Sequence, residues 1–143
     1  MISVFTDGSF NWATPPGYGF VAVSEQGEEI MKGCGTVRND GTASFAAEVA
    51  AVLAALTYAV DHGHNEVRIL TDLETMAKHI ARAQRADRRT MLRKLRAFLQ
   101  AHPSLSVTVV KARAGHCMLQ VAHHLARSAA AGAGRNRTAL AAI

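Results

Sequence analysis

The sequence predicts an α/β fold, with a five-stranded mixed sheet and helices on both of its faces. Strand-like and helix-like segments follow one another in the order β-β-β-α-β-α-α-β-α. The first three strands are joined by short connections, which favour an antiparallel meander. Strands separated by a helix are usually parallel through right-handed crossovers, so we expect the fourth and fifth strands to run parallel to the first.

The strands are predicted from short runs of β-branched and aromatic residues that are bounded by turn residues. The first ends at the turn signal Asp7-Gly8-Ser9, and residues 11–17, which contain Pro15-Pro16-Gly17, are expected to form a loop. Glycines at positions 33 and 35 make the third strand irregular and suit an edge of the sheet. The five predicted strands are residues 2–6, 18–24, 30–37, 67–71 and 105–110.

The helices are predicted from apolar residues that recur every three or four positions. In the longest helix, Val49, Val52 and Leu56 lie on such a stripe, and Gly63 supplies the stop signal. The four predicted helices are residues 44–61, 73–84, 88–100 and 119–131.

Length and composition indicate one domain, residues 1–131, followed by a flexible tail at residues 132–143 that contains glycine and arginine. A hydrophobic content of 49% and a charged content of 19% exclude a disordered or collagen-like chain. No apolar run reaches the roughly 18 to 20 residues of a membrane helix, and the N-terminus lacks the features of a signal peptide. Two cysteines without a CxxC pair suit a reducing compartment, so we expect a cytoplasmic protein.

Charge is distributed unevenly along the chain, whose formal net charge is +5. Residues 88–143 hold ten basic residues and no acidic one, whereas all eleven acidic residues lie in residues 1–87. A segment without carboxylates presents a cationic surface, which favours a polyanionic partner such as nucleic acid. A solvated basic surface without a ligand is the alternative.

Three carboxylates are predicted to converge at one edge of the sheet. Asp7 and Asp72 each follow a strand, at the carboxyl ends where ligands gather in open sheets. Glu48 lies on the inward stripe of its helix, where a carboxylate is costly unless it is paired or bound to a metal. Converging carboxylates suit a hard cation, Mg²⁺ or Mn²⁺. Taken singly, Asp7 could be a turn residue, Asp72 a helix N-cap and Glu48 part of a local ion pair.

Four short motifs follow one another on these predicted elements: Thr6-Asp7-Gly8-Ser9, Gly17-Tyr18-Gly19, Ala47-Glu48 and Leu70-Thr71-Asp72. In these motifs the sequence resembles the type 1 ribonuclease H family, over about residues 1–131. The resemblance implies the ribonuclease H-like fold and a four-acid metal site, in which Asp7, Glu48 and Asp72 are the first three carboxylates. It implies an enzyme that uses two divalent ions to hydrolyse the RNA strand of RNA–DNA hybrids, leaving 3′-hydroxyl and 5′-phosphate ends. We expect a monomer whose partner is the hybrid, with no protein or membrane partner.

The fourth acidic position departs from the family pattern. Counting back from Leu125-Ala126-Arg127 places His123 there, and no acidic residue follows Asp87. A neutral imidazole binds a divalent ion through nitrogen without adding negative charge, so weaker Mg²⁺ binding and a preference for Mn²⁺ are expected. A surface or core histidine without a metal is the alternative.

Further differences from the family concern the contacts with substrate. Arg113 stands where the family has a loop histidine, and we expect it to stabilise or anchor phosphate. The family has a polar turn before its second acid, and the resemblance implies that Thr42 and Ser44, in the corresponding turn before Glu48, contact the substrate.

The Trp-rich basic protrusion of some family members is absent. Helix 88–100 is our candidate for binding the phosphates of the DNA strand, unless its basic side is only the solvated side of an amphipathic helix. The predicted contacts on this helix are Arg89, Arg93 and Arg96.

Two other functions are compatible with the sequence. A catalytically weakened hybrid-binding module would keep the basic half of the chain but bind without cleaving. Another nuclease with the same fold, such as a junction resolvase or an exonuclease, is the second alternative, because one fold hosts several activities. The hybrid-cleaving enzyme is favoured because a pure binding module gains nothing by clustering three carboxylates.

Overall fold

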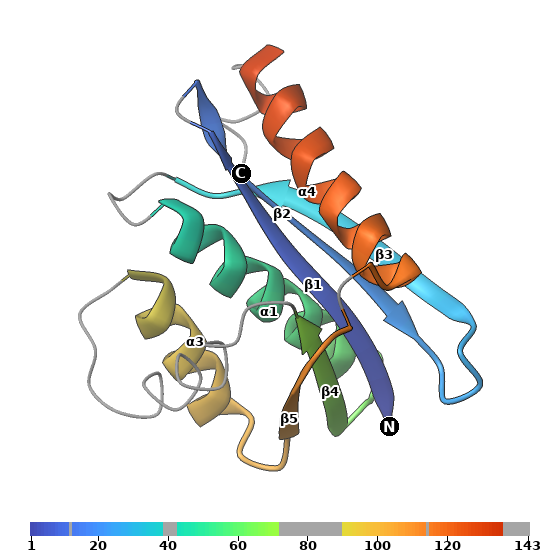
Figure 1. The fold of residues 1–143 in the computed structure, drawn as a ribbon. Helices are drawn as coiled ribbons and strands as arrows, with labels where there is room; N and C mark the ends of the chain where they lie inside the picture. Colours follow the sequence, from blue (N-terminus) through green and yellow to red (C-terminus); the bar gives the residue numbers. More distant parts are fainter. Residues whose placement is uncertain (12, 39–42, 72–89, 114, 136–143) are drawn as a thin grey trace.

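The computed structural model describes residues 1–11, 13–38, 43–71, 90–113 and 115–135 of the chain. Five strands form one mixed sheet: β1 (Ile2–Asn11), β2 (Thr14–Val23), β3 (Glu29–Thr36), β4 (Glu66–Thr71) and β5 (Ser106–Lys111). Their order across the sheet is β3-β2-β1-β4-β5 (Figure 1). The β1–β2 and β2–β3 pairs are antiparallel, whereas the β1–β4 and β4–β5 pairs are parallel. The predicted meander and the predicted parallel strands are therefore confirmed.

The first hairpin is longer than predicted. β1 continues through the predicted turn at residues 7–9, and most of the predicted loop belongs to β2. Pro15 and Pro16 lie beyond the last β2–β3 pair, Gly17 with Thr36, and beside a register shift in the β1–β2 ladder. Proline has no N–H for a ladder, so this end of β2 tolerates two prolines that a central part of the strand would not.

The glycines of β3 are not irregular, although β3 is an edge strand as predicted. A Cβ on Gly33 would overlap the ring of Phe20, and a Cβ on Gly35 would overlap the ring of Tyr18. The two glycines therefore make room for aromatic rings while the strand keeps its register. The register shift between β2 and β3 lies elsewhere, between Ala22 and Val23.

Three helices are described: α1 (Ala43–Asp61), α3 (Thr90–Ala101) and α4 (Cys117–Arg135). α1 agrees with the prediction and ends at Asp61, two residues before Gly63. The φ of 77° at Gly63 favours glycine. α4 continues past residue 131, so the first part of the predicted tail is helical. The predicted helix 73–84 and residues 136–143 lie outside the described residues. No helix in the described part of the chain is long and apolar enough to cross a membrane.

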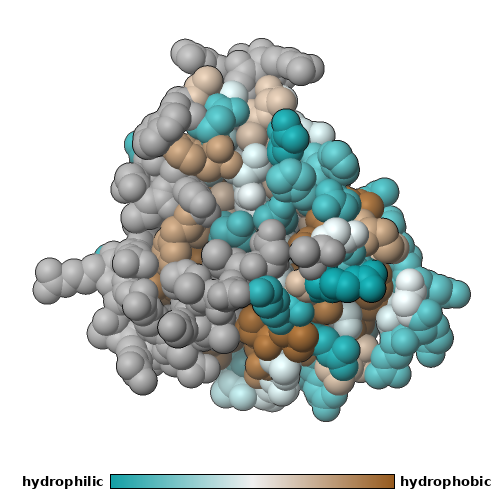
Figure 2. Space-filling view, viewed as in Figure 1, coloured by the Kyte–Doolittle hydropathy of each residue, from teal (hydrophilic) through white to brown (hydrophobic). Residues whose placement is uncertain are grey.

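The helices cover both faces of the sheet, as predicted. α1 and α3 lie on one face and α4 on the other (Figure 1). Val4 and Phe20 pack in the core with α1 and α3, whereas Phe5 and Val21 pack in a second core with α4. This division follows from the alternation of side chains along a strand. Asp7, two residues after Phe5, therefore lies on the α4 face of the sheet. The outward side of α4 is largely hydrophilic (Figure 2).

Candidate active site

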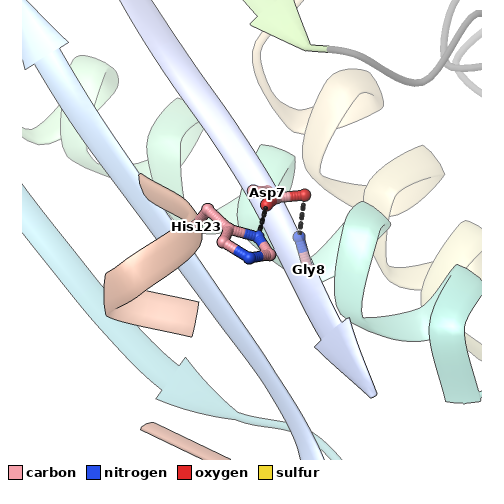
Figure 3. A network of polar contacts seen from close by, with 3 residues as sticks. All are labelled: Asp7, Gly8 and His123. Carbon is pink, nitrogen blue, oxygen red and sulfur yellow. Dashed lines mark hydrogen bonds and ion pairs between the residues drawn. The ribbon is translucent and has the colours of Figure 1, made fainter. Parts of the chain in front are cut away.

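Asp7 on β1 and His123 on α4 are in direct contact. The Nδ1 atom of His123 lies 2.6 Å from Oδ2 of Asp7, and the backbone N–H of Gly8 donates to Oδ1 of Asp7 at 2.9 Å (Figure 3). The Asp7 side chain is only 8% exposed, whereas the His123 side chain is 42% exposed. Both oxygens of a buried carboxylate therefore have a hydrogen-bond partner, one of which is a partly exposed side chain.

The strand pairing of β1 changes before Asp7. β1 pairs with β4 only over residues 2–5, while its pairing with β2 continues past Asp7. The cross-strand partner of Asp7 on β2 is Gly19. At Asp7, therefore, the described pairing of β1 is with β2 alone.

Small residues bring α4 close enough to reach this carboxylate. A Cβ on Gly19 would overlap the carbonyl oxygen of Ala122, and a Cβ on Gly17 would overlap that of Ala126. Ala122, Ala126 and Ala130 are buried along one side of α4. The helix backbone therefore lies directly on β2, and His123 follows Ala122 at the side that faces Asp7.

Glu48 approaches β1 from α1, on the other face of the sheet. Glu48 is 9% exposed, and its backbone nitrogen would lie 2.7 Å from a Cβ on Gly8. Gly8 follows Asp7 directly, so the predicted first and second acids belong to adjoining parts of the structure. Both residues are buried.

The third predicted acid, Asp72, lies outside the described residues, immediately after the end of β4. Within the described ranges, no group of three or more His, Cys, Asp or Glu residues is close enough to hold a metal ion. The chemistry of Asp7 and Glu48 fits a hard cation, because both are buried carboxylates with oxygen donors. Mg²⁺ or Mn²⁺ would be held by these two residues together with Asp72.

The predicted substrate contacts are only partly described. Arg113 is exposed in the loop between β5 and α4, where its carbonyl accepts a hydrogen bond from the N–H of His116. Arg93 is exposed on α3, whereas Arg96 is half-buried and its Nε atom has no hydrogen-bond partner among the described residues. Neighbouring residues therefore cover part of the Arg96 side chain, unlike that of Arg93.

Three other predicted contacts cannot be placed at the substrate. Thr42 and Arg89 lie outside the described residues, as does the side chain of Ser44, whose backbone belongs to the first turn of α1.

Sequence reasoning did not find the structural role of His116. Its carbonyl accepts the N–H of Gln120, its Nδ1 accepts the N–H of Met118 at 3.1 Å, and its ring stacks on Phe5 with centroids 4.6 Å apart. These contacts make His116 the N-cap of α4.

The close packing of α4 on β2 could have been predicted from the spacing of Gly17 and Gly19. Glycines two residues apart in a strand share a face and mark the close approach of another backbone.

The chain matches the family model described as reverse transcriptase-like over residues 5–129. No curated protein matches it. Among solved structures, ribonuclease H1 from the archaeon Halobacterium salinarum is similar at 22% identity, with a TM-score of 0.71 over 90% of this chain and 96% of that one. The N-terminal ribonuclease H domain of a Mycobacterium tuberculosis protein is 20% identical, with a TM-score of 0.74 over 96% and 98% of the two chains.

A third structure, LC11-RNase H1 in complex with an RNA/DNA hybrid, is 19% identical, with a TM-score of 0.75 over 93% of this chain and 99% of that one. Identities this low establish a shared architecture, whereas the family model covers most of the sequence itself. The chain therefore has the ribonuclease H-like fold and belongs to the reverse transcriptase-like family.

Proposed function

We propose that this protein is a metal-dependent endonuclease that hydrolyses the RNA strand of RNA–DNA hybrids and leaves 3′-hydroxyl and 5′-phosphate ends. The observation that carries the proposal is the burial of Asp7 and Glu48 on adjoining parts of β1 and α1. A buried carboxylate is costly to a fold unless it is hydrogen-bonded, paired or bound to a cation, and cation binding is the role proposed for these two residues.

The proposed cofactor is a pair of divalent ions, Mg²⁺ or Mn²⁺, held by Asp7, Glu48 and Asp72. Bound there, such ions would stabilise the charge that develops as water displaces the leaving oxygen in line. The chain itself supplies the buried carboxylates and the hydrogen bonds that fix the orientation of Asp7.

The proposed substrate is supported by the structural relatives and by charge. LC11-RNase H1 was solved with an RNA/DNA hybrid, and so was a foamy viral protease-reverse transcriptase, which has a TM-score of 0.65. The stretch without acidic residues, 88–143, includes exposed cations on α3 and in the loop before α4. Arg93 and Arg113 are therefore proposed to contact phosphates.

The test is cleavage of an end-labelled RNA–DNA hybrid in Mg²⁺ and, separately, in Mn²⁺. We expect cuts within the RNA strand only, with 5′-phosphate ends identified by mass spectrometry. Asp7→Asn should abolish cleavage, because it removes a buried negative charge from the site. Asp61→Asn is the matched control, since Asp61 is exposed at the end of α1 and its substitution should leave cleavage unchanged.

A hybrid-binding module is the second candidate, because His123, which the resemblance assigns to the position of the fourth acid, is in contact with Asp7. Tight binding of the hybrid without cleavage in either metal would favour that function over the enzyme. Faster cleavage of duplex RNA or branched DNA in competition assays would instead indicate another nuclease of this fold.

A further inference from the structure

We propose that His123 positions Asp7 and does not itself bind the metal ion, an inference that rests on the proposed metal-dependent function. If His123 replaces the fourth acid of the family as a metal ligand, one of its ring nitrogens binds the ion. In the structure, Nδ1 of His123 contacts Asp7 instead.

The distance between the two side chains is that of a hydrogen bond. Two ligand atoms at right angles around Mg²⁺, each about 2.1 Å from it, are about 3.0 Å apart. Nδ1 of His123 and Oδ2 of Asp7 are 2.6 Å apart. An ionised carboxylate only accepts hydrogen bonds, so this contact assigns the hydrogen to Nδ1 in the proposal. A nitrogen that donates this hydrogen has no lone pair left for a metal ion.

A hydrogen-bond donor beside Oδ2 stabilises the charge of the Asp7 carboxylate. Its side chain is 8% exposed, so hydration does little to stabilise its charge. The Gly8 N–H engages Oδ1 and the imidazole engages Oδ2, so the carboxylate plane is fixed from both sides. Each oxygen keeps a second acceptor position for a cation. Partners of this kind orient metal-binding carboxylates, and their loss typically weakens metal binding.

The packing of the backbone places α4, and with it His123, beside Asp7. α4 rests on Gly17 and Gly19 of β2, so its distance from β1 is set by packing. Figure 3 shows the imidazole reaching from α4 with Nδ1 toward Asp7 and the other ring nitrogen away from it. The hydrogen bond therefore forms in the fold itself.

A consequence concerns the choice of metal. If His123 bound the ion, its nitrogen would favour Mn²⁺ over Mg²⁺. If it only positions Asp7, the ion meets oxygen donors alone, and a substitution that removes the hydrogen bond should weaken the binding of both ions by the same factor.

Nuclear magnetic resonance can observe the hydrogen directly. Two-bond ¹H–¹⁵N correlation spectra of the histidine-labelled protein report the protonation of both ring nitrogens, and His123→Asn identifies the resonances of His123 among the seven histidines. We expect Nδ1 to carry the hydrogen in the free protein and to keep it at saturating Mg²⁺. Loss of the Nδ1 hydrogen, or a Mg²⁺-dependent change at the other nitrogen, would make His123 a ligand and overturn the inference.

Two variants give an independent readout by calorimetric titration with Mg²⁺ and with Mn²⁺. His123→Asn can place an amide N–H near the position of Nδ1, and we expect its affinities to stay close to wild type. His123→Ala removes the donor and should weaken both ions about tenfold. His124→Asn is the matched control, because His124 is the exposed neighbour of His123 on α4. This substitution should leave the affinities for both ions unchanged.

The outcomes separate this inference from the proposed function. An Asn variant as weak as the Ala variant would contradict the positioning role while leaving the metal-dependent function intact. A wild-type protein that binds neither ion would overturn the proposed function and the inference together.

Discussion

Gly19 of β2 and Ala122 of α4 are in backbone contact: a Cβ on Gly19 would overlap the carbonyl oxygen of Ala122. Gly19 is also the cross-strand partner of Asp7, and Ala122 precedes His123. One glycine therefore sets the distance between the helix and the strand that carry the two halves of the Asp7–His123 contact.

Replacing this glycine should affect both stability and the site. We expect Gly19→Ala to lower the free energy of unfolding by about 1–3 kcal/mol, because backbone cannot move aside as a flexible side chain can. The displaced α4 should also lose the hydrogen bond between His123 and Asp7. Urea unfolding measures the first effect, and the ring-nitrogen spectra of His123 measure the second.

The control for this substitution lies in α4, the helix that packs on Gly19. Gly132 has open space around its Cβ position, so Gly132→Ala should leave stability unchanged or raise it by about 0.5–1 kcal/mol. If Gly19→Ala were as stable as wild type and kept the hydrogen bond, the packing of α4 on β2 would not determine the position of His123.

The N-cap role of His116 predicts how its variants differ. His116→Ala removes the acceptor for the N–H of Met118 and should cost about 1 kcal/mol of unfolding free energy. His116→Asn keeps an acceptor and should recover most of that loss, apart from the stacking on Phe5. Thermal or urea unfolding ranks the three proteins. A large loss of hybrid cleavage in His116→Asn with unchanged stability would instead place His116 in the catalytic machinery.

The strand order was predictable because it depends on local patterns. Short turns favour antiparallel neighbours, and helical spacing at residues 44–61 indicates a crossover to a parallel strand. The extent of the first hairpin was not predictable in the same way. The local sequence around Pro15 and Pro16 predicts a loop. Their place in β2 depends on the pairing with neighbouring strands, which the local sequence does not reveal.

The site was predictable in composition but not in geometry. Asp7 and Glu48 could be identified because one ends a strand motif and the other interrupts an apolar stripe. The contact between Asp7 and His123 joins residues 116 positions apart and depends on the depth at which α4 packs. The burial of Arg96 could not be predicted for the same reason. Helical spacing puts Arg96 on the same side of α3 as Arg93, whereas part of the Arg96 side chain is buried in the folded protein.

Exposed cations on α3 should contribute to hybrid binding through phosphate contacts. Arg93→Ala and Lys94→Ala are each expected to reduce the slope of log affinity against log salt by about 1 if the residue contacts a phosphate. Fluorescence anisotropy with a labelled hybrid over a range of salt concentrations measures the slope. Lys32→Ala is the control, because Lys32 lies on the edge strand β3 and pairs with Glu29. If the salt slopes of all variants equalled that of the wild-type protein, the basic side of α3 would be a solvated surface that does not contact the hybrid.

Tyr18 should make the stability of the protein depend on alkaline pH. Burial raises the pKa of its phenol above the usual value of 10.0, and negative charge on Cys34 raises it further. A raised pKa in the folded state means that ionisation favours unfolding. The unfolding free energy should therefore be unaffected by Tyr18 below pH 10 and should fall as pH rises through the higher pKa of the folded state.

Absorbance at the wavelength of tyrosinate, compared between wild type and Tyr18→Phe, isolates the titration of Tyr18 from that of the other tyrosine. Cys34→Ala should lower the pKa of Tyr18 only in part, because burial is the larger cause. Tyr18→Phe should also remove this component of the loss of stability at alkaline pH. A pKa of Tyr18 at or below 10 in the folded protein would mean that its hydroxyl is open to water beside Gly35 rather than packed against it.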